Sequence, residues 1–161
     1  MTENKIKQFK QDVYDIIGAA MEVHSQLRFG LLEAVYEESL WLELADRGIA
    51  AQRQQEIEIY YKRHLLEKRY KMDLVIGDIV VELKSSGRIC SAHRAQLCNY
   101  LRLTHKPVGV LINFGTPTLQ GERWLYDSET NECILVDKNL NPVFSDEDLF
   151  GDGTEYTDEN K

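Results

Sequence analysis

The sequence has little proline and no long apolar run. Its three prolines are scattered, so no Pro-rich linker divides the chain. No apolar stretch approaches the ~20 residues that a membrane-spanning helix requires. The first twelve residues, MTENKIKQFKQD, also lack the apolar segment of a signal peptide. We therefore expect a soluble, cytoplasmic protein without a membrane partner.

Cysteine is scarce as well. Cys90, Cys98 and Cys133 are the only three, and none forms a C-x-x-C pair or a zinc-like cluster with the four histidines. We expect ordinary reduced thiols rather than a disulfide or a zinc site.

Positive charge is in the minority, with a formal net charge of −8. Seven acids and one lysine lie between Asp146 and Lys161, so the rest of the chain carries only −2. From Leu83 to Gly121 there is no acid at all, and five basic residues occur: Lys84, Arg88, Arg94, Arg102 and Lys106. This asymmetry permits a local positive surface on an acidic protein, although scattered solvated charges would give the same pattern.

The composition favours one folded domain. With 161 residues, 43% hydrophobic and 29% charged, the chain is long enough to bury a core. We place this domain at residues 1–149. We expect residues 150–161, FGDGTEYTDENK, to form an acidic, flexible tail.

Hydrophobic periodicity predicts the order of elements ααβββαβ. Apolar residues at steps of three and four indicate a helix over 6–27 and a second helix over 31–48, which ends at a glycine. Alternating patterns then predict a three-stranded antiparallel meander, EIEIYY, LLEKRYKMDLVI and IVVELKS. Helical spacing returns over 91–105, and the apolar run VGVLINF is typical of a central strand. ERWLYDS and ECILVDK suggest a further hairpin or edge pair.

The stretch MDLVIGDIVVELKSS carries charges inside strand-like sequence. If Gly77-Asp78 is a two-residue type II′ loop, the register places Asp73 opposite Glu82, with Lys84 on the same face. Two carboxylates 4 Å apart repel by on the order of 4 kcal/mol at an effective dielectric of ~20, unless a proton or cation lies between them. Mg²⁺ or Mn²⁺ would suit such oxygen ligands. An exposed polar hairpin, with Asp73 paired to Lys71 or Arg69, is the alternative.

Two further motifs, in order with this hairpin, resemble a known family. VHSQLRFGLLEAVYEESL holds Gly30, Glu33 and Tyr36 in a G-x-x-E-x-x-Y spacing, and AHRAQLCNYLRLT holds Gln96 and Tyr100 in a Q-x-x-x-Y spacing. Together with MDLVIGDIVVELK they resemble the bacterial GxxExxY family of the PD-(D/E)xK nuclease-like superfamily, over about residues 16–114. Arg28-Phe29 stands where members of that family often have a Gly-Pro pair.

The resemblance implies a fold and a set of site residues. The fold would be α/β, with a restriction-endonuclease-like αβββαβ core, a mixed sheet flanked by helices, an extra N-terminal helix and a C-terminal hairpin or edge strands. The implied metal ligands, for Mg²⁺ or Mn²⁺, are Glu33, Asp73 and Glu82. Lys84 would be the catalytic lysine, and Gln96 and Tyr100 would orient the lysine, the substrate or the metal shell.

The favoured function is hydrolysis of phosphodiester bonds by a divalent-metal-dependent nuclease, in DNA rather than RNA. Arg88, Arg94 and Arg102 are expected to bind substrate phosphates, although they could also be plain surface. A binding module for nucleic acid or for a protein partner, without turnover, is the second hypothesis, and a structural scaffold is the third. Endonuclease or exonuclease action stays open, as does assembly as a homodimer or within a larger complex.

Overall fold

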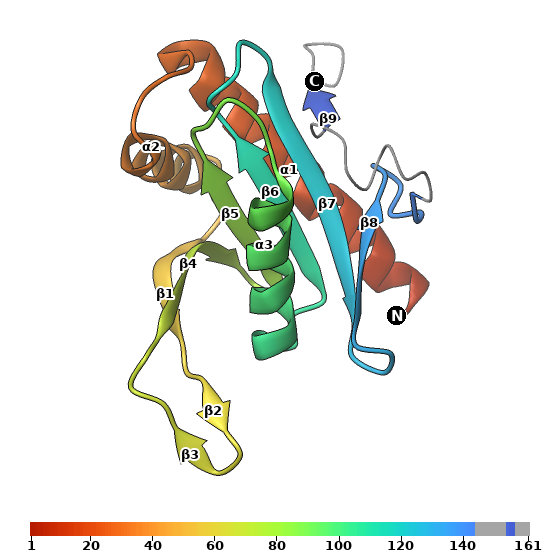
Figure 1. The fold of residues 1–161 in the computed structure, drawn as a ribbon. Coiled ribbons are helices and arrows are strands. Elements are labelled where there is room, and N and C mark those ends of the chain that lie inside the picture. Colours follow the sequence, from red (N-terminus) through yellow and green to blue (C-terminus); the bar gives the residue numbers. More distant parts are fainter. Residues whose placement is uncertain (144–153, 157–161) are drawn as a thin grey trace.

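The computed structural model describes residues 1–143 and 154–156 of the chain. It contains three helices and a central mixed sheet (Figure 1). The helices are α1 (Glu3–Leu27), α2 (Glu33–Asp46) and α3 (Ser91–Thr104). The strands are β1 (Gln52–Ile57), β2 (Tyr60–Tyr61), β3 (His64–Leu65), β4 (Tyr70–Ile76), β5 (Ile79–Lys84), β6 (Val108–Asn113), β7 (Leu119–Asp127), β8 (Glu132–Val136) and β9 (Thr154–Tyr156).

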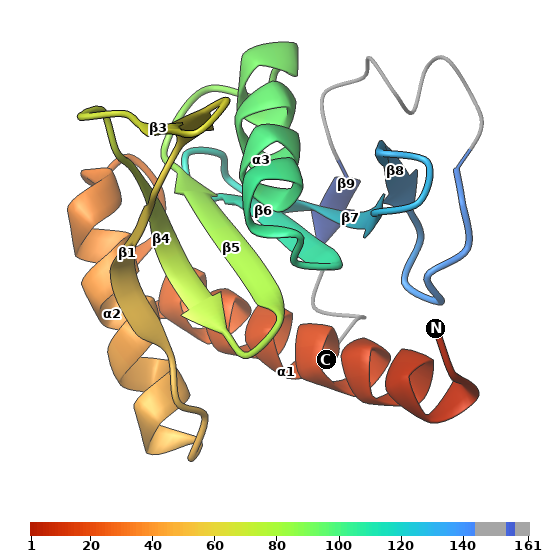
Figure 2. The same ribbon diagram turned by 90° about the horizontal axis from the view of Figure 1, so that it is seen from below.

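The sheet runs in the order β1-β4-β5-β6-β7-β8, with β9 also paired to β7. Among the described strands, only β5 and β6 are parallel neighbours, and α3 makes the crossover between them. Figure 2 shows α1 on one face of the sheet and α3 on the other, with α2 beside β1 and β4. The predicted ααβββαβ order and the C-terminal hairpin of β7 and β8 are therefore confirmed.

Two apolar cores result from this layering. Strand residues 79, 81 and 83 pack against α1 and α2, whereas Val80 faces α3 because side chains alternate along β5. Every residue of β6 is buried, as its continuous apolar run predicts for a strand covered on both sides. Within the described residues, no helix is long and apolar enough to cross a bilayer.

The structure differs from the predicted meander at its first turn. The pattern EIEIYY suggested one strand, but β1 ends at Ile57, whose partner in β4 is Tyr70. The intervening residues leave the main sheet and form a separate two-stranded sheet, β2 and β3. Alternation in the sequence cannot show this departure, because both sheets have the same period.

The prediction of reduced thiols was wrong for two of the three cysteines. Cys98 on α3 and Cys133 on β8 form a disulfide, with their Cα atoms 5.9 Å apart. The packing of α3 against the sheet brings together residues 35 positions apart in sequence, at a separation suited to a disulfide. Only Cys90 is free. The predicted tail, residues 150–161, lies outside the described residues except for β9.

Strands β5 and β6 are fixed side by side where they leave the sheet. The side chain of Asn113, fully buried at the end of β6, accepts hydrogen bonds from the backbone N–H groups of Ser86 (3.0 Å) and Gly115 (3.1 Å). Its amide group donates to the Ser86 carbonyl and to Gln120, both at 3.0 Å. All the hydrogen-bonding capacity of this amide is thus used to hold the segment that follows Lys84.

This close approach predicts a severe effect at Gly115. A Cβ atom at Gly115 would overlap the backbone N and O of Ser86, so Gly115→Ala should reduce the free energy of unfolding by about 2–3 kcal/mol. Gly87→Ala is the matched control, because no atom lies within 4 Å of its Cβ position. Urea unfolding of the two variants tests this, and equal midpoints would contradict it.

Candidate functional site

The β4–β5 hairpin has the predicted register. Ile76 pairs with Ile79, Val75 with Val80 and Leu74 with Val81. Gly77 has a φ of 57° and Asp78 does not have a positive φ, as a type II′ loop requires. The local turn chemistry therefore fixes which residues of β4 and β5 meet.

The ladder stops where the acids begin. Instead of a backbone pair, Glu82 Oε1 accepts from the Asp73 backbone N–H at 3.0 Å, and Asp73 Oδ2 accepts from the Leu83 N–H at 2.8 Å. Strand β1 lies on the other side of Asp73, and Gln54 of β1 and Asp73 are likewise not paired in the β1–β4 ladder. Gln54 has a φ of 50°. Such an interruption redirects side chains. The two carboxyl groups thus lie beside each other, each bonded to backbone of the neighbouring strand.

Tyr36 and Gly30 position the start of α2, which carries Glu33. The buried hydroxyl of Tyr36 donates to the Arg28 carbonyl at 2.6 Å and accepts from the Leu31 N–H at 3.1 Å. Gly30 has a φ of 96°, a conformation that a side chain would disfavour. The G-x-x-E-x-x-Y spacing therefore has a structural reason: the glycine permits the loop, the tyrosine holds it, and the glutamate is placed at the helix start.

The loop before α2 is also tied to the end of β5. Ser85 Oγ donates to the Leu31 carbonyl at 2.6 Å. The backbone N–H of Ser85 interacts with the Glu33 carboxylate and lowers its pKa, as does the positive charge of Lys84. Glu33 is exposed at the edge of the site, and desolvation by the surrounding protein outweighs these effects and raises its pKa.

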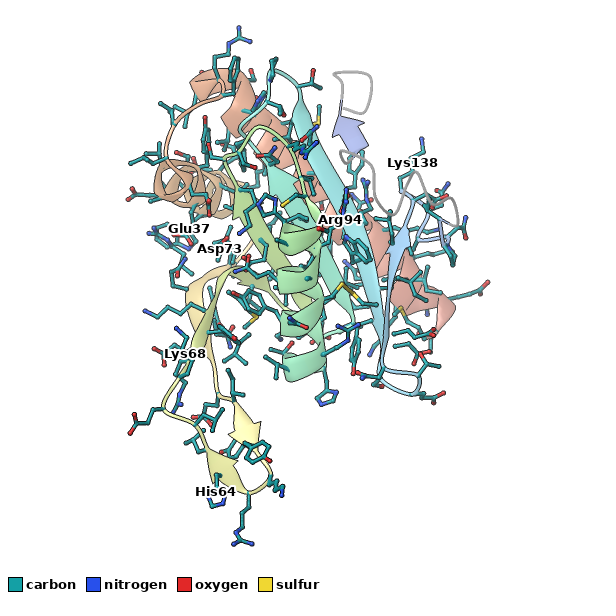
Figure 3. All side chains as sticks on the ribbon, in the orientation of Figure 1. Glu37, His64, Lys68, Asp73, Arg94 and Lys138 are labelled. Carbon is teal, nitrogen blue, oxygen red and sulfur yellow. A yellow bond between two sulfur atoms is a disulfide. The ribbon has the colours of Figure 1, made fainter. Side chains whose placement is uncertain are left out.

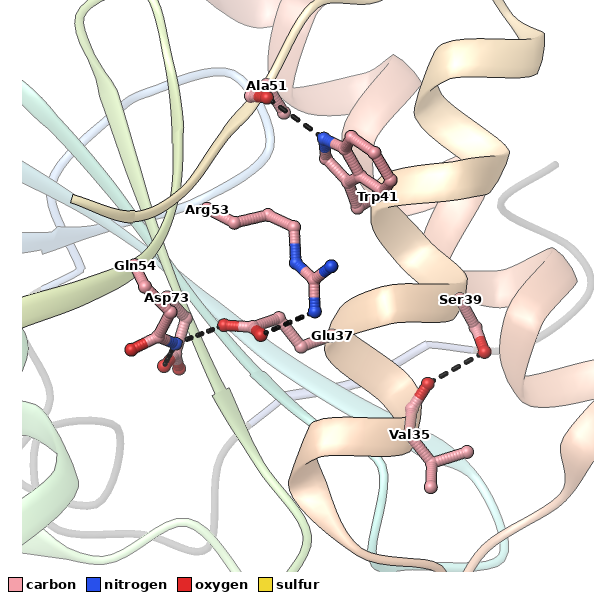
Figure 4. Close-up of polar contacts among 8 residues, drawn as sticks. All are labelled: Val35, Glu37, Ser39, Trp41, Ala51, Arg53, Gln54 and Asp73. Atoms are coloured by element: carbon pink, nitrogen blue, oxygen red, sulfur yellow. Dashed lines mark hydrogen bonds and ion pairs between the residues drawn. The ribbon is translucent and has the colours of Figure 1, made fainter.

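Glu37 is a site acid that the sequence analysis missed. It lies one turn after Glu33 on the same face of α2 and is only 7% exposed. Its carboxylate accepts a hydrogen bond from the side-chain amide of Gln54 and forms an ion pair with Arg53 at 3.3 Å (Figure 4). Gln54 also donates to Asp73 Oδ1 at 3.3 Å. The i, i+4 spacing of the two glutamates was the available signal.

Lys84, Gln96 and Tyr100 form one hydrogen-bonded chain. The Lys84 ammonium donates to Gln96 Oε1 at 2.7 Å, and Gln96 Nε2 donates to the Tyr100 hydroxyl at 2.8 Å. The structure thus brings together the three residues that the E-x-K and Q-x-x-x-Y motifs predicted as neighbours. Helix α3 supplies Gln96 and Tyr100 from one face because four residues make about one turn.

Two of the three predicted phosphate-binding arginines, Arg94 and Arg102, bind groups outside this site. Arg94 is 5% exposed and forms an ion pair with Glu122 at 2.6 Å, in the interior beneath α3 (Figure 3). Arg102 reaches the Asn131 carbonyl, in the turn between β7 and β8. Arg88 is exposed in the segment that follows β5. Arg94 is therefore not an exposed phosphate-binding residue, since its buried guanidinium group needs the carboxylate of Glu122 as a partner.

Burial controls the electrostatics of the carboxyl pair. It raises the pKa of Glu82 to about 9, together with the negative charge of Asp73. Burial also raises the pKa of Asp73, and the N–H of Leu83 opposes this effect. At neutral pH the isolated pair therefore retains a proton.

Three acids, Glu33, Glu37 and Asp73, line a cavity of about 220 Å³ together with Ala34, Gln54 and Leu83. Within residues 1–143, no group of three or more His, Cys, Asp or Glu side chains is already arranged to hold a metal ion. The chemistry of the donors nevertheless suits a hard cation, because such cations prefer oxygen ligands and Asp73 and Glu82 supply carboxylate oxygens.

Comparison with known proteins gives the superfamily of the chain. A family model described as the PD-(D/E)XK nuclease superfamily matches residues 10–124. The chain belongs to the PD-(D/E)XK nuclease superfamily. Members of this superfamily generally use divalent metals. Among solved structures, SSO0001 is similar, with a TM-score of 0.48 and 18% identity over 79% of this chain and 65% of the other. No curated protein sequence matches.

The raised pKa of Glu82 predicts a pH-dependent gain of stability in Glu82→Gln. In the unfolded chain this carboxyl ionises near 4.5, and in the folded, metal-free protein near 9, so wild type loses stability as pH rises between these values. Glutamine cannot ionise and keeps the acceptor for the Asp73 N–H. We expect the variant to match wild type near pH 4.5 and to exceed it by roughly 2–4 kcal/mol at pH 8.

Urea unfolding in EDTA at the two pH values measures this difference. Glu38→Gln, an exposed change on α2, is the control and should follow wild type at both. Parallel pH profiles for wild type and Glu82→Gln would contradict the prediction.

Proposed function

We propose that the protein hydrolyses phosphodiester bonds in nucleic acid, DNA in preference to RNA, with Mg²⁺ or Mn²⁺ held by Glu33, Asp73 and Glu82. The observation that carries this proposal is that acids of α2 and β4 line one cavity, while the buried Glu82 of β5 accepts a hydrogen bond from the Asp73 backbone N–H. The positive charge of Lys84 acts on both Glu33 and Glu82. The G-x-x-E-x-x-Y geometry supports placing the chain within the GxxExxY branch of the superfamily.

Each residue has a distinct task in this proposal. A metal bound at the carboxylates would polarise the scissile phosphate and lower the pKa of a bound water. Asp73 is held for this purpose by the Leu83 N–H and by Gln54. Lys84 would donate to a phosphate oxygen or position the attacking water, since Gln96 and Tyr100 fix its ammonium group. Glu37 would orient Gln54 or complete the ligand set.

A binding module without turnover is the competing function. Its support is that the carboxyl pair is already satisfied without a cation: Glu82 bonds the Asp73 N–H and its pKa of about 9 keeps it neutral. Such a site could bind nucleic acid without cutting it. The two functions differ in whether millimolar metal is required and whether the acids affect turnover.

Metal binding should be coupled to proton release. Because Glu82 is protonated at neutral pH, a cation that takes its carboxylate must displace the proton, so Mn²⁺ affinity should rise up to about tenfold per pH unit between pH 6 and 8. Isothermal titration in buffers of different ionisation enthalpy measures both the Mn²⁺ affinity and the number of protons released. Asp73→Asn should lose binding and Glu38→Gln should retain it; no Mg²⁺ or Mn²⁺ binding at millimolar metal would refute the metal site.

Cleavage should depend on the acids and on Lys84 in different ways. With single-stranded, duplex and nicked DNA as substrates, Glu82→Ala should abolish metal-dependent cutting. Lys84→Ala should slow it by about 10²–10³-fold while Mn²⁺ affinity changes little, because the lysine acts on charge developing at the phosphate. Glu38→Gln is again the control. If Glu82→Ala cuts as fast as wild type, the catalytic assignment fails.

A further inference from the structure

An arm projects from the sheet between β1 and β4. We use this name for residues 58–69, which contain β2 and β3. Figure 1 shows it extending away from the body of the molecule, beyond the end of the sheet. Every residue from Tyr60 to Lys68 is exposed. A segment so exposed contributes little to the core, so its composition calls for another explanation.

The arm combines exposed rings with positive charge. Tyr60 and Tyr61 are 59% and 62% exposed. The arm has four basic residues and two acids, in a chain whose net charge is −8. Its basic residues are Lys62, Arg63, Lys68 and Arg69. Figure 3 places His64 near its tip and Lys68 nearer the sheet.

The rings and charges are arranged in pairs. The Lys62 ammonium lies 5.5 Å from the centre of the Tyr61 ring, and that of Lys68 lies 6.0 Å from the Tyr70 ring. Aromatic faces next to cations suit unpaired nucleotides, because bases stack on the rings and phosphates attract the cations. Pairing with the arm of a second copy is less suitable, because that arm carries the same excess of basic residues and the two would repel.

The root of the arm touches the lysine network of the candidate site. The ring of Tyr70 lies 5.8 Å from that of Tyr100, whose hydroxyl accepts from Gln96, the partner of Lys84. Asp73 is only three residues further along β4, or roughly 10 Å at 3.3 Å per residue. A strand of nucleic acid with a phosphate at the cavity would therefore have a short path to the arm.

We propose that the arm holds unpaired nucleotides of the substrate, next to the bond that lies at the cavity. Tyr60 and Tyr61 stack on bases, and Lys62, Arg63 and Lys68 contact phosphates. This inference rests on the proposed function in one respect, namely that the substrate is nucleic acid. It adds the form of that substrate: single strands, or duplexes with a single-stranded extension, in preference to blunt duplex.

The test is DNA binding without cleavage. Fluorescence anisotropy in EDTA would compare a labelled single strand, the blunt duplex and a duplex with an overhang. Losing one stacked base weakens binding about 5- to 150-fold, so Tyr60→Ala/Tyr61→Ala should weaken single-strand binding at least tenfold. Lys62→Gln/Arg63→Gln should reduce the salt slope by about 1.4, because each phosphate contact to a single strand contributes about 0.7.

Two further proteins make the experiment specific. Lys5→Gln/Lys7→Gln removes two exposed charges from the N-terminal end of α1 and is the charge-matched control, which should bind single strands as wild type does. An armless variant replaces residues 58–69 by Asn-Gly. Ile57 and Tyr70 are the last bridged pair, so a two-residue turn keeps the register of β1 and β4. Circular dichroism verifies folding, and the variant should lose preference for single strands.

The outcomes separate the arm from the site. If the arm variants bind single strands as tightly as wild type, or if the charge-matched control loses as much affinity, the arm proposal is overturned and the proposed function stands. If wild type is a dimer and the armless variant a monomer with unchanged DNA affinity, the arm binds a second copy instead. If wild type binds no nucleic acid, both proposals fail. Loss of cleavage in Glu82→Ala with single-strand binding retained supports both.

Discussion

The structure depends on one electrostatic constraint: Asp73 and Glu82 are too close, and Glu82 too deeply buried, for both to ionise alone. Glu82 is 2% exposed, and burial raises the pKa of both carboxyl groups. Each carboxyl takes a backbone N–H that a regular ladder would have used, so β4 and β5 separate at this point. Either a proton or a cation must neutralise part of the negative charge of the two carboxyl groups. The ionisation of Glu82 therefore affects the free energy of unfolding, its pH dependence and the affinity for a metal.

The rest of the molecule holds this pair and its surroundings in place. Asn113 fixes the chain where β5 ends, and Tyr36 fixes the loop that leads to Glu33. Helix α3 reaches across from the opposite core and holds Lys84 through Gln96. The acids and the lysine thus meet at the edge between two hydrophobic cores. Packing changes in either core would be felt at the site, because protein interiors transmit small displacements.

Local patterns predicted most of the elements and part of the site. Two-residue turns have few solutions, so Gly77-Asp78 was enough to give the register of β4 and β5. Helical spacing was enough to place Gln96 and Tyr100 on one face. Similar spacing would have shown Glu37 one turn after Glu33, but an isolated glutamate on a helix gives no sign of burial. The arm could not be predicted from the sequence either, because its strands have the same alternating pattern as the strands of the main sheet.

The sequence alone determined the order of elements and the register of the β4–β5 hairpin, because these follow from interactions within a few residues. Only the tertiary structure decided which distant groups meet. Arg94 has no acid within the chain from Leu83 to Gly121, yet Glu122 pairs with it when α3 packs on β7. Cys98 meets Cys133 through the same packing. Such contacts join residues about 30 positions apart, and their distances depend on how helices and sheet pack rather than on local preference.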